Sequence, residues 1–156
     1  MTIKILSLIT VLAYSMIVSQ SFMYILALRN AQLGLDANAY TAVRQLIDAS
    51  MRGSFKYVIY SALLANLLLV IATAKAPGSL LFITAAIAFV ALVADTLITV
   101  KGNLPINDII NTWTPDNIPA NWMEYRTKWL TVFGYRQVIN IVGFASLVTG
   151  IVFRLK

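Results

Sequence analysis

The sequence predicts an all-α integral membrane protein, a four-helix bundle, and three observations support this. Of its 156 residues, 60% are hydrophobic and 12% are charged, whereas an ordinary soluble domain has about 25% charged residues. The mean hydropathy of +0.80 is too high for a chain of this length to bury its apolar surface away from water. Four apolar stretches reach about 20 residues, the length that a helix needs to cross a bilayer.

The four expected spans cover residues 5–28, 55–74, 80–100 and 129–153, and together form one transmembrane domain over residues 1–156. Backbone groups in lipid must be satisfied within the segment, so each span is expected to be helical. The first span is too long for the apolar part of a signal peptide and lacks a good cleavage site, so we expect it to be retained. The Ala-Pro-Gly-Ser turn at 76–79 and both termini then lie on one side, opposite two long loops.

The first long loop predicts an amphipathic helix that lies on the membrane or caps the bundle. Arg44 and Asp48 are four residues apart, a spacing at which their side chains can pair on a helix. Apolar residues recur at helical spacing and so share one face of this helix, and the charged residues lie outside that face. Its members are Leu35, Ala39, Val43, Leu46, Ile47 and Ser50.

The second long loop predicts a short helix, capped by Asn107, followed by a proline-enforced turn. Asn121 and Glu124 have the spacing of a capping box, so we expect the last helix to begin near Trp122. That start lies well before the apolar run, and the first two turns of the helix should protrude from the hydrocarbon core. The expected aromatic belt at this interface consists of Trp113, Trp122, Tyr125 and Trp129.

Charge and composition limit the partners. The net charge of +6 favours contact with the bilayer and its anionic lipids, whereas scattered basic residues do not indicate nucleic acid. The modest excess of Lys and Arg in the long loops favours placing them in the cytoplasm. Because the sequence contains no Cys and no His, thiolate and imidazole ligands are absent, and we expect no metal and no cofactor.

Polar residues inside the spans are the strongest functional signal, because such groups are costly in lipid and usually pair or line a cavity. Counting along the helices places Asp95 and Arg136 about 9–10 Å from the long-loop side, so we expect them to pair or to face each other across a pocket. Gln20, Asn66 and Asn140 come out deeper, at about 13–16 Å. The alternative is structural, since amides join helices and a buried ion pair can serve packing alone.

One pattern spans the second long loop and the last helix. It contains a Gly-Asn-x-Pro-x-Asn segment, a tryptophan, Pro-x-x-Trp, Arg-x-x-Trp and a final arginine, all within residues 102–136. In this order and spacing the pattern resembles the anthrone-oxygenase-like family of small bacterial and fungal membrane proteins. The matching residues are Gly102, Asn103, Pro105, Asn107, Trp113, Pro119, Trp122, Arg126, Trp129 and Arg136.

The resemblance implies a multi-pass protein of a bacterial inner membrane, with four spans and a cofactor-independent oxidation of aromatic anthrones. The family places a histidine three residues before the final arginine, where this chain has Phe133. A histidine would be a natural general base for deprotonating an anthrone, and phenylalanine cannot serve. The catalytic residues are therefore unknown, and it is uncertain whether the protein is an enzyme.

Three functions remain open. The first is binding or oxidation of a lipophilic ring compound such as a quinone. The second is a non-catalytic subunit or scaffold of a larger membrane complex, or a homo-oligomer. The third is a channel or transporter protomer. Inverted repeats or broken helices would support this function, but the sequence shows neither. For the first function the expected ligand-binding residues are Arg136, Asp95, Asn103, Asn107, Arg126, Trp122, Trp129, Asn140, Gln20 and Asn66.

Overall fold

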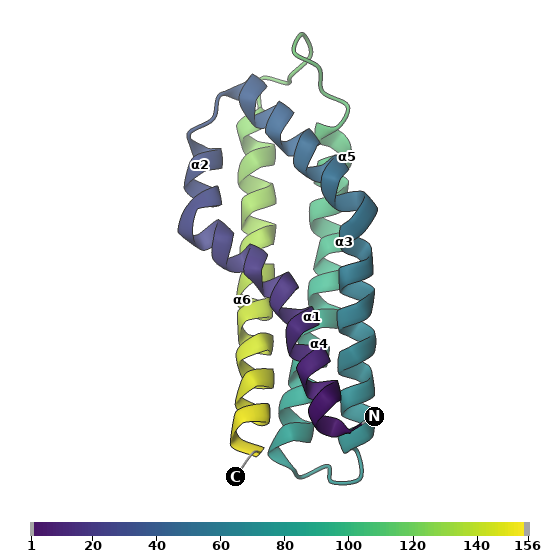
Figure 1. The fold of residues 1–156 in the computed structure, drawn as a ribbon. Coiled ribbons are helices and arrows are strands. Elements are labelled where there is room, and N and C mark those ends of the chain that lie inside the picture. The colour runs from purple at the N-terminus through teal and green to yellow at the C-terminus, as the bar shows by residue number, and fades with distance from the viewer. Residues whose placement is uncertain (1, 155–156) are drawn as a thin grey trace.

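The computed structural model describes residues 2–154, so residue 1 and residues 155–156 of the expected domain lie outside it. The chain forms four long helical runs that pack as a bundle (Figure 1). Each run is long and apolar enough to span a membrane, which confirms the predicted fold class. The elements are α1 (Ile3–Met23), η1 (Tyr24–Leu28), α2 (Arg29–Leu33), α3 (Ala37–Thr73), α4 (Leu80–Ile98), η2 (Thr99–Asn103), α5 (Leu104–Ile110) and α6 (Trp122–Arg154).

The helices α4 and α6 and the later part of α3 run side by side along the bundle, whereas α1 and the first part of α3 slant across it (Figure 1). Both termini and the turn between α3 and α4 lie at one end, and the loop before α6 lies at the other. α4 packs along α6, and α1 contacts both α3 and α6. Because α1 slants, it is close to α3 only at the end that carries the termini.

The half of the bundle near the termini is filled by an apolar core, which includes Leu6, Leu69, Ala85 and Leu147. Large apolar side chains also point outwards all around this half, and Leu12 is 57% exposed. An apolar exterior over an apolar core is what a lipid-facing helix bundle requires, because lipid solvates the outer side chains.

The first long loop is almost entirely helical, which corrects the expectation of a separate amphipathic helix. Only residues 34–36 connect α2 to α3, and the Asp36 side chain caps α3 by accepting a hydrogen bond from the Ala39 N–H (2.8 Å). The expected amphipathic segment is the first part of α3, continuous with the second span.

Two charged residues of this segment, Arg44 and Asp48, are also not on its exposed face, where the amphipathic pattern predicts them. Arg44 is 3% exposed and Asp48 is 5% exposed, whereas Leu46 on the supposedly inward face is 69% exposed. Water outside the segment would favour charged residues on the surface. Here the charged face turns inwards, and its hydrogen-bond partners lie inside the protein on Tyr24, Asn107 and Asn111.

The short helix of the second long loop is present as α5, but it continues from α4 through the π-helical turn η2 rather than standing alone. Asn107 lies inside α5 and does not cap it, and Pro105 occupies the first turn of α5, where a proline is tolerated. α6 begins at Trp122 as predicted. The expected capping box, in which the two side chains bond to backbone N–H groups, is not formed in this way. Instead, the Asn121 side chain donates to the Glu124 carboxylate (3.3 Å).

Two π-helical turns, η1 and η2, lie in the half of the bundle near the long loops. Such turns insert an extra residue into a helix and redirect its side chains, frequently at functional sites. In η2 a glycine is required, because a Cβ on Gly102 would lie 2.6 Å from a methyl carbon of Val132 on α6. The π turn thereby brings Asn103 against α6.

Gly143 should be sensitive to a single added methyl group. A Cβ there would overlap the hydroxyl of fully buried Tyr14 and lie 2.6 Å from the Cβ of Ala91. We expect Gly143→Ala to lower the free energy of unfolding by about 1–3 kcal/mol, as overpacking does. Gly53→Ala is the control, because nothing lies within 4 Å of a Cβ there, and replacing a helical glycine stabilises by up to about 1 kcal/mol. Thermal unfolding of both variants in one detergent measures the difference, and an equal effect would contradict the close packing.

Candidate functional site

A buried ion pair joins α4 to α6. The Arg136 Nε donates to Asp95 Oδ1 at 2.7 Å, and both side chains are less than 10% exposed. Their depths along the two helices match, as the sequence predicted. A charge in the low-dielectric interior is tolerated when it is paired and its remaining hydrogen bonds are satisfied.

A chain of hydrogen bonds leads from this pair towards the long loops. Arg136 Nη1 donates to Asn103 Oδ1 (3.0 Å), and Asn103 Nδ2 donates to the Trp129 carbonyl oxygen (3.1 Å). The Trp129 indole N–H in turn donates to Asn107 Oδ1 (2.8 Å). These contacts fix η2 and α5 against α6, so the polar residues of the second loop form one rigid wall.

The inward face of α3 continues the chain. Arg44 Nη2 donates to Asn107 Oδ1 (2.8 Å), and Asn107 Nδ2 donates to Asp48 Oδ1 (2.8 Å). Asp48 Oδ2 also accepts from Asn111 (2.7 Å) and from Arg52 Nε (2.6 Å). Arg44 and Asp48 do not form the ion pair expected from their spacing, because Asn107 lies between their polar groups and bonds to each of them.

Aromatic rings line the same region. The rings of Trp129 and Phe133 are stacked, with centroids 5.1 Å apart and planes 14° apart. The Tyr24 ring lies 4.4 Å from Phe133, and its hydroxyl accepts from Arg44 Nη1 (3.3 Å). The Arg44 guanidinium carbon lies 3.9 Å from the centroid of the Trp129 ring. This cation–π contact further stabilises a cation that is removed from water.

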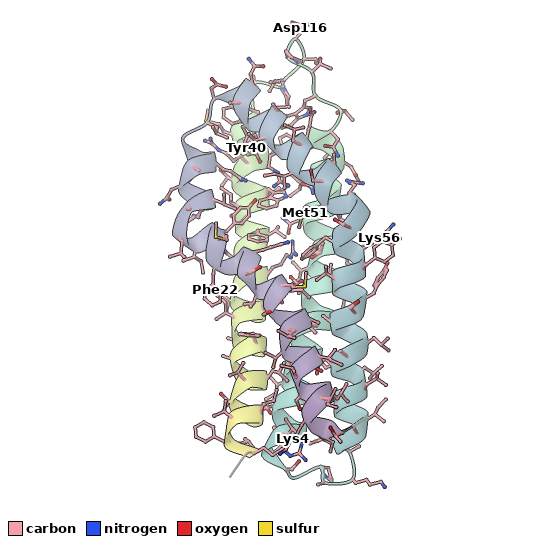
Figure 2. All side chains as sticks on the ribbon, in the orientation of Figure 1. Lys4, Phe22, Tyr40, Met51, Lys56 and Asp116 are labelled. Atoms are coloured by element: carbon pink, nitrogen blue, oxygen red, sulfur yellow. The ribbon has the colours of Figure 1, made fainter. Side chains whose placement is uncertain are left out.

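A cavity of about 660 Å³ lies between this wall and the diverging α1 and α3. One side is formed by α1 and η1, through Gln20, Met23 and Tyr24, and the opposite side by α3, through Ile47, Met51 and Phe55. Figure 2 shows Met51 in the space between α1 and α3. Both helices can span a membrane, and the cavity between them has the volume of a small-molecule site.

Two arginines that line the cavity each have a donor without a partner within residues 2–154. Arg44 Nε is buried without a hydrogen bond. Arg136 uses its Nε and Nη1 atoms, which leaves its Nη2 group without a bond in the described chain. Arg44 Nε is closed off from the cavity, whereas Arg136 Nη2 is accessible there and can donate to an acceptor in the cavity.

Half of the residues predicted for the site lie on the cavity lining. These are Arg136, Asn103, Asn107, Trp129 and Gln20. Asp95 lies behind Arg136 and positions it. The remaining four, Arg126, Trp122, Asn140 and Asn66, are not on the lining.

Arg126 and Trp122 instead hold the connection between α2 and α3. Arg126 Nη1 donates to the carbonyl oxygens of Gln32, Leu33 and Leu35 at 3.1–3.2 Å. Its guanidinium carbon lies 4.7 Å from the centroid of the Trp122 ring. The connection therefore has its carbonyl groups satisfied by α6.

Asn66 and Asn140 lie deeper than the cavity. In the orientation of its side-chain amide that satisfies both the NH2 group and the oxygen, Asn66 donates to the Ala85 carbonyl (3.1 Å) and accepts from the Phe89 N–H (3.3 Å). It thus acts as an interhelical hydrogen bond between α3 and α4. Asn140 is 3% exposed, and its Oδ1 has no hydrogen-bond partner in the described part of the chain.

Sequence reasoning did not select Arg44, Asp48, Tyr24 or Phe133 as cavity residues, although all four line it. Arg44, Asp48 and Arg52 follow one another at four-residue intervals, and this spacing could have indicated a shared polar face on the helix. Residues at that spacing share one helix face, but the sequence does not say whether that face meets lipid, water or protein.

No family model, curated protein or solved structure matches the chain. Within residues 2–154, no three His, Cys, Asp or Glu side chains gather as metal ligands would. The contacts of the described residues are therefore the basis for assigning a function.

The Asp95–Arg136 pair should respond to mutation as a coupled unit. Asp95→Asn leaves a buried arginine without its counter-ion, and Arg136→Gln leaves a buried carboxylate, so each should cost about 3–5 kcal/mol in the free energy of unfolding. The double variant should be more stable than the sum of the two losses predicts, by about 1–3 kcal/mol. Chemical unfolding in detergent micelles measures all three variants.

Asp108→Asn is the matched control for this cycle. Asp108 pairs with Arg52, but its side chain is 62% exposed, and an exposed pair contributes at most about 1 kcal/mol. Strict additivity of Asp95→Asn and Arg136→Gln would contradict the coupling.

Proposed function

We propose that the cavity between α1 and α3 binds a lipophilic ring compound that carries hydrogen-bond-accepting oxygens, as a quinone does. The observation that carries this proposal is the unsatisfied Arg136 Nη2 donor on the cavity lining, beside the stacked rings of Trp129 and Phe133. Planar rings fit such a surface by stacking, and an acceptor oxygen satisfies the donor.

The charges on the lining favour an electron-rich or anionic acceptor. Four basic side chains and one carboxylate line the cavity, namely Arg44, Arg52, Lys56, Arg136 and Asp48. Hydrogen bonds between a charged donor and an acceptor are roughly twice as strong as neutral ones. A hydrocarbon chain without oxygens would leave the Arg136 Nη2 group unpaired, so it fits the site poorly.

The resemblance to the anthrone-oxygenase-like family supports the same class of ligand. Of the residues that carry the resemblance, Asn103, Asn107, Trp129 and Arg136 line this one cavity. Membership of that family, and a location in a bacterial inner membrane, are part of the proposal. So is affinity for a tricyclic anthrone or the corresponding quinone.

We propose binding without oxidation. Phe133 takes the place where the family has its histidine, and it lies on the lining, stacked on Trp129. The two nearby carboxylates are both engaged, because Asp95 pairs with Arg136, and Asp48 accepts from Asn107, Asn111 and Arg52. A general base must reach the proton that it removes, and neither carboxylate is free to do so.

Ligand binding should quench the fluorescence of Trp129. In a Trp113→Phe/Trp122→Phe background, which leaves Trp129 as the single tryptophan, a naphthoquinone or anthraquinone should quench the emission saturably in lipid nanodiscs. Met51→Phe should weaken this binding about tenfold, because it fills the cavity, and overpacking costs a few kcal/mol at most. Met16→Phe, at an exposed position on α1, should leave the affinity unchanged.

Linear, collision-type quenching that Met51→Phe does not alter would contradict the binding site. Native purification followed by mass spectrometry gives an independent outcome. A stoichiometric protein partner with no ring compound would favour the alternative, a non-catalytic subunit of a larger membrane complex.

The absence of turnover has its own test. Oxidation of an anthrone by dioxygen yields the anthraquinone and water, and it begins with removal of a proton from the anthrone. We expect no acceleration by the wild-type protein, and dioxygen consumption above background with Phe133→His, because a histidine can act as the missing base. Phe133→Leu is the control without a base. Anthrone oxidation by the wild-type protein at the rate of Phe133→His would contradict binding without oxidation.

A further inference from the structure

A second cavity, also of about 660 Å³, lies between α1 and α6 at the end of the bundle that carries the termini. Lys4 marks this end in Figure 2. The cavity is separate from the one between α1 and α3, because the two share no lining residue. Nothing in the proposed function uses it.

Two basic side chains from different helices, Lys4 of α1 and Arg154 of α6, line this second cavity. No carboxylate pairs with either of them among the described residues. α1 contains no acidic residue, and the last one in α6, Glu124, lies at the opposite end of that helix. Among residues 2–154, therefore, no carboxylate compensates the positive charge of the cavity.

A buried polar group also faces this cavity. Ser7 is 5% exposed and lines it, and its hydroxyl makes no hydrogen bond with residues 2–154. The N-terminus of α1 adds a third feature. Thr2 makes no capping hydrogen bond through its side chain, and the first turn holds no acidic residue, so the positive end of the helix dipole is unopposed. Anions bind at such helix ends.

The rest of the cavity is apolar. Leu8 and Val11 of α1 face Val148, Ile151 and Val152 of α6. Leu8 and Val152 are more than half exposed, so in a membrane this groove is in contact with acyl chains. A free phosphate ion would use only the polar end, whereas a phospholipid would use both parts.

We propose that this groove between α1 and α6 is a specific site for an anionic phospholipid. The phosphate lies between Lys4 and Arg154 and accepts a hydrogen bond from the Ser7 hydroxyl. One acyl chain lies along Leu8, Val11 and Val148. A lipid bound here joins the first and last helices at the end where the chain terminates.

Native mass spectrometry of the detergent-solubilised full chain tests the site, with phosphatidylglycerol and phosphatidylcholine of equal chain length. We expect one phosphatidylglycerol to be retained in preference to phosphatidylcholine. Lys4→Gln/Arg154→Gln should reduce its affinity about 25-fold, because each basic residue near an anionic lipid contributes a factor of about five. Ser7→Ala should reduce it about threefold or more, because a hydrogen bond to a charged group is lost.

Lys75→Gln/Lys128→Gln is the matched control, since it removes the same net charge from exposed positions outside the groove. It should leave the retained phosphatidylglycerol unchanged, and Lys4→Arg should preserve binding. An equal loss in the control, or equal retention of phosphatidylcholine, would overturn the proposal. Displacement of the lipid by millimolar inorganic phosphate would also overturn it, because that result identifies a site for the free ion.

Discussion

The bundle depends on one constraint, which is that a polar group inside a bilayer must find its partner inside the protein. The buried ion pair between Arg136 and Asp95 satisfies this constraint for two charged side chains. From Arg136 the hydrogen bonds pass through Asn103 to the Trp129 backbone, and from the Trp129 indole through Asn107 to α3. Each further polar residue is held by the one before it, so the half of the bundle near the long loops is ordered by polar contacts rather than by an apolar core.

The same constraint explains why the two halves of the molecule differ. Near the termini, small and aliphatic residues let the helices approach closely, as at Gly143. Near the long loops, the π-helical turns η1 and η2 and the slant of α1 separate the helices. The space that results is lined by charges and stacked rings. One guanidinium donor on this lining, Arg136 Nη2, is unpaired within residues 2–154 and is available to a hydrogen-bond acceptor.

Binding and chemistry make separate demands on this cavity. In the proposed function, the stacked rings of Trp129 and Phe133 and the Arg136 donor serve recognition of the ligand. Catalysis of proton removal would need a free base, and Phe133 and the engaged carboxylates Asp48 and Asp95 do not provide one. The lipid groove between α1 and α6 is a third, independent element, since it uses charges that the cavity between α1 and α3 does not contain.

The sequence by itself determined the four apolar helices, the start of α6 at Trp122 and the pairing of Asp95 with Arg136. Helix length and depth follow directly from counting residues at a fixed rise. Only the tertiary structure decided that the charged face of α3 turns inwards. Helical periodicity separates two faces but does not identify what each one meets. Here the charged face meets Asn107 of α5 and Asn111, which follows α5. The tertiary structure also placed Asn66 deeper in the bundle than the cavity and Asn103 on the cavity wall. Both placements depend on the slant of α1 and the π turn at Gly102, which result from packing between helices that lie far apart in the sequence.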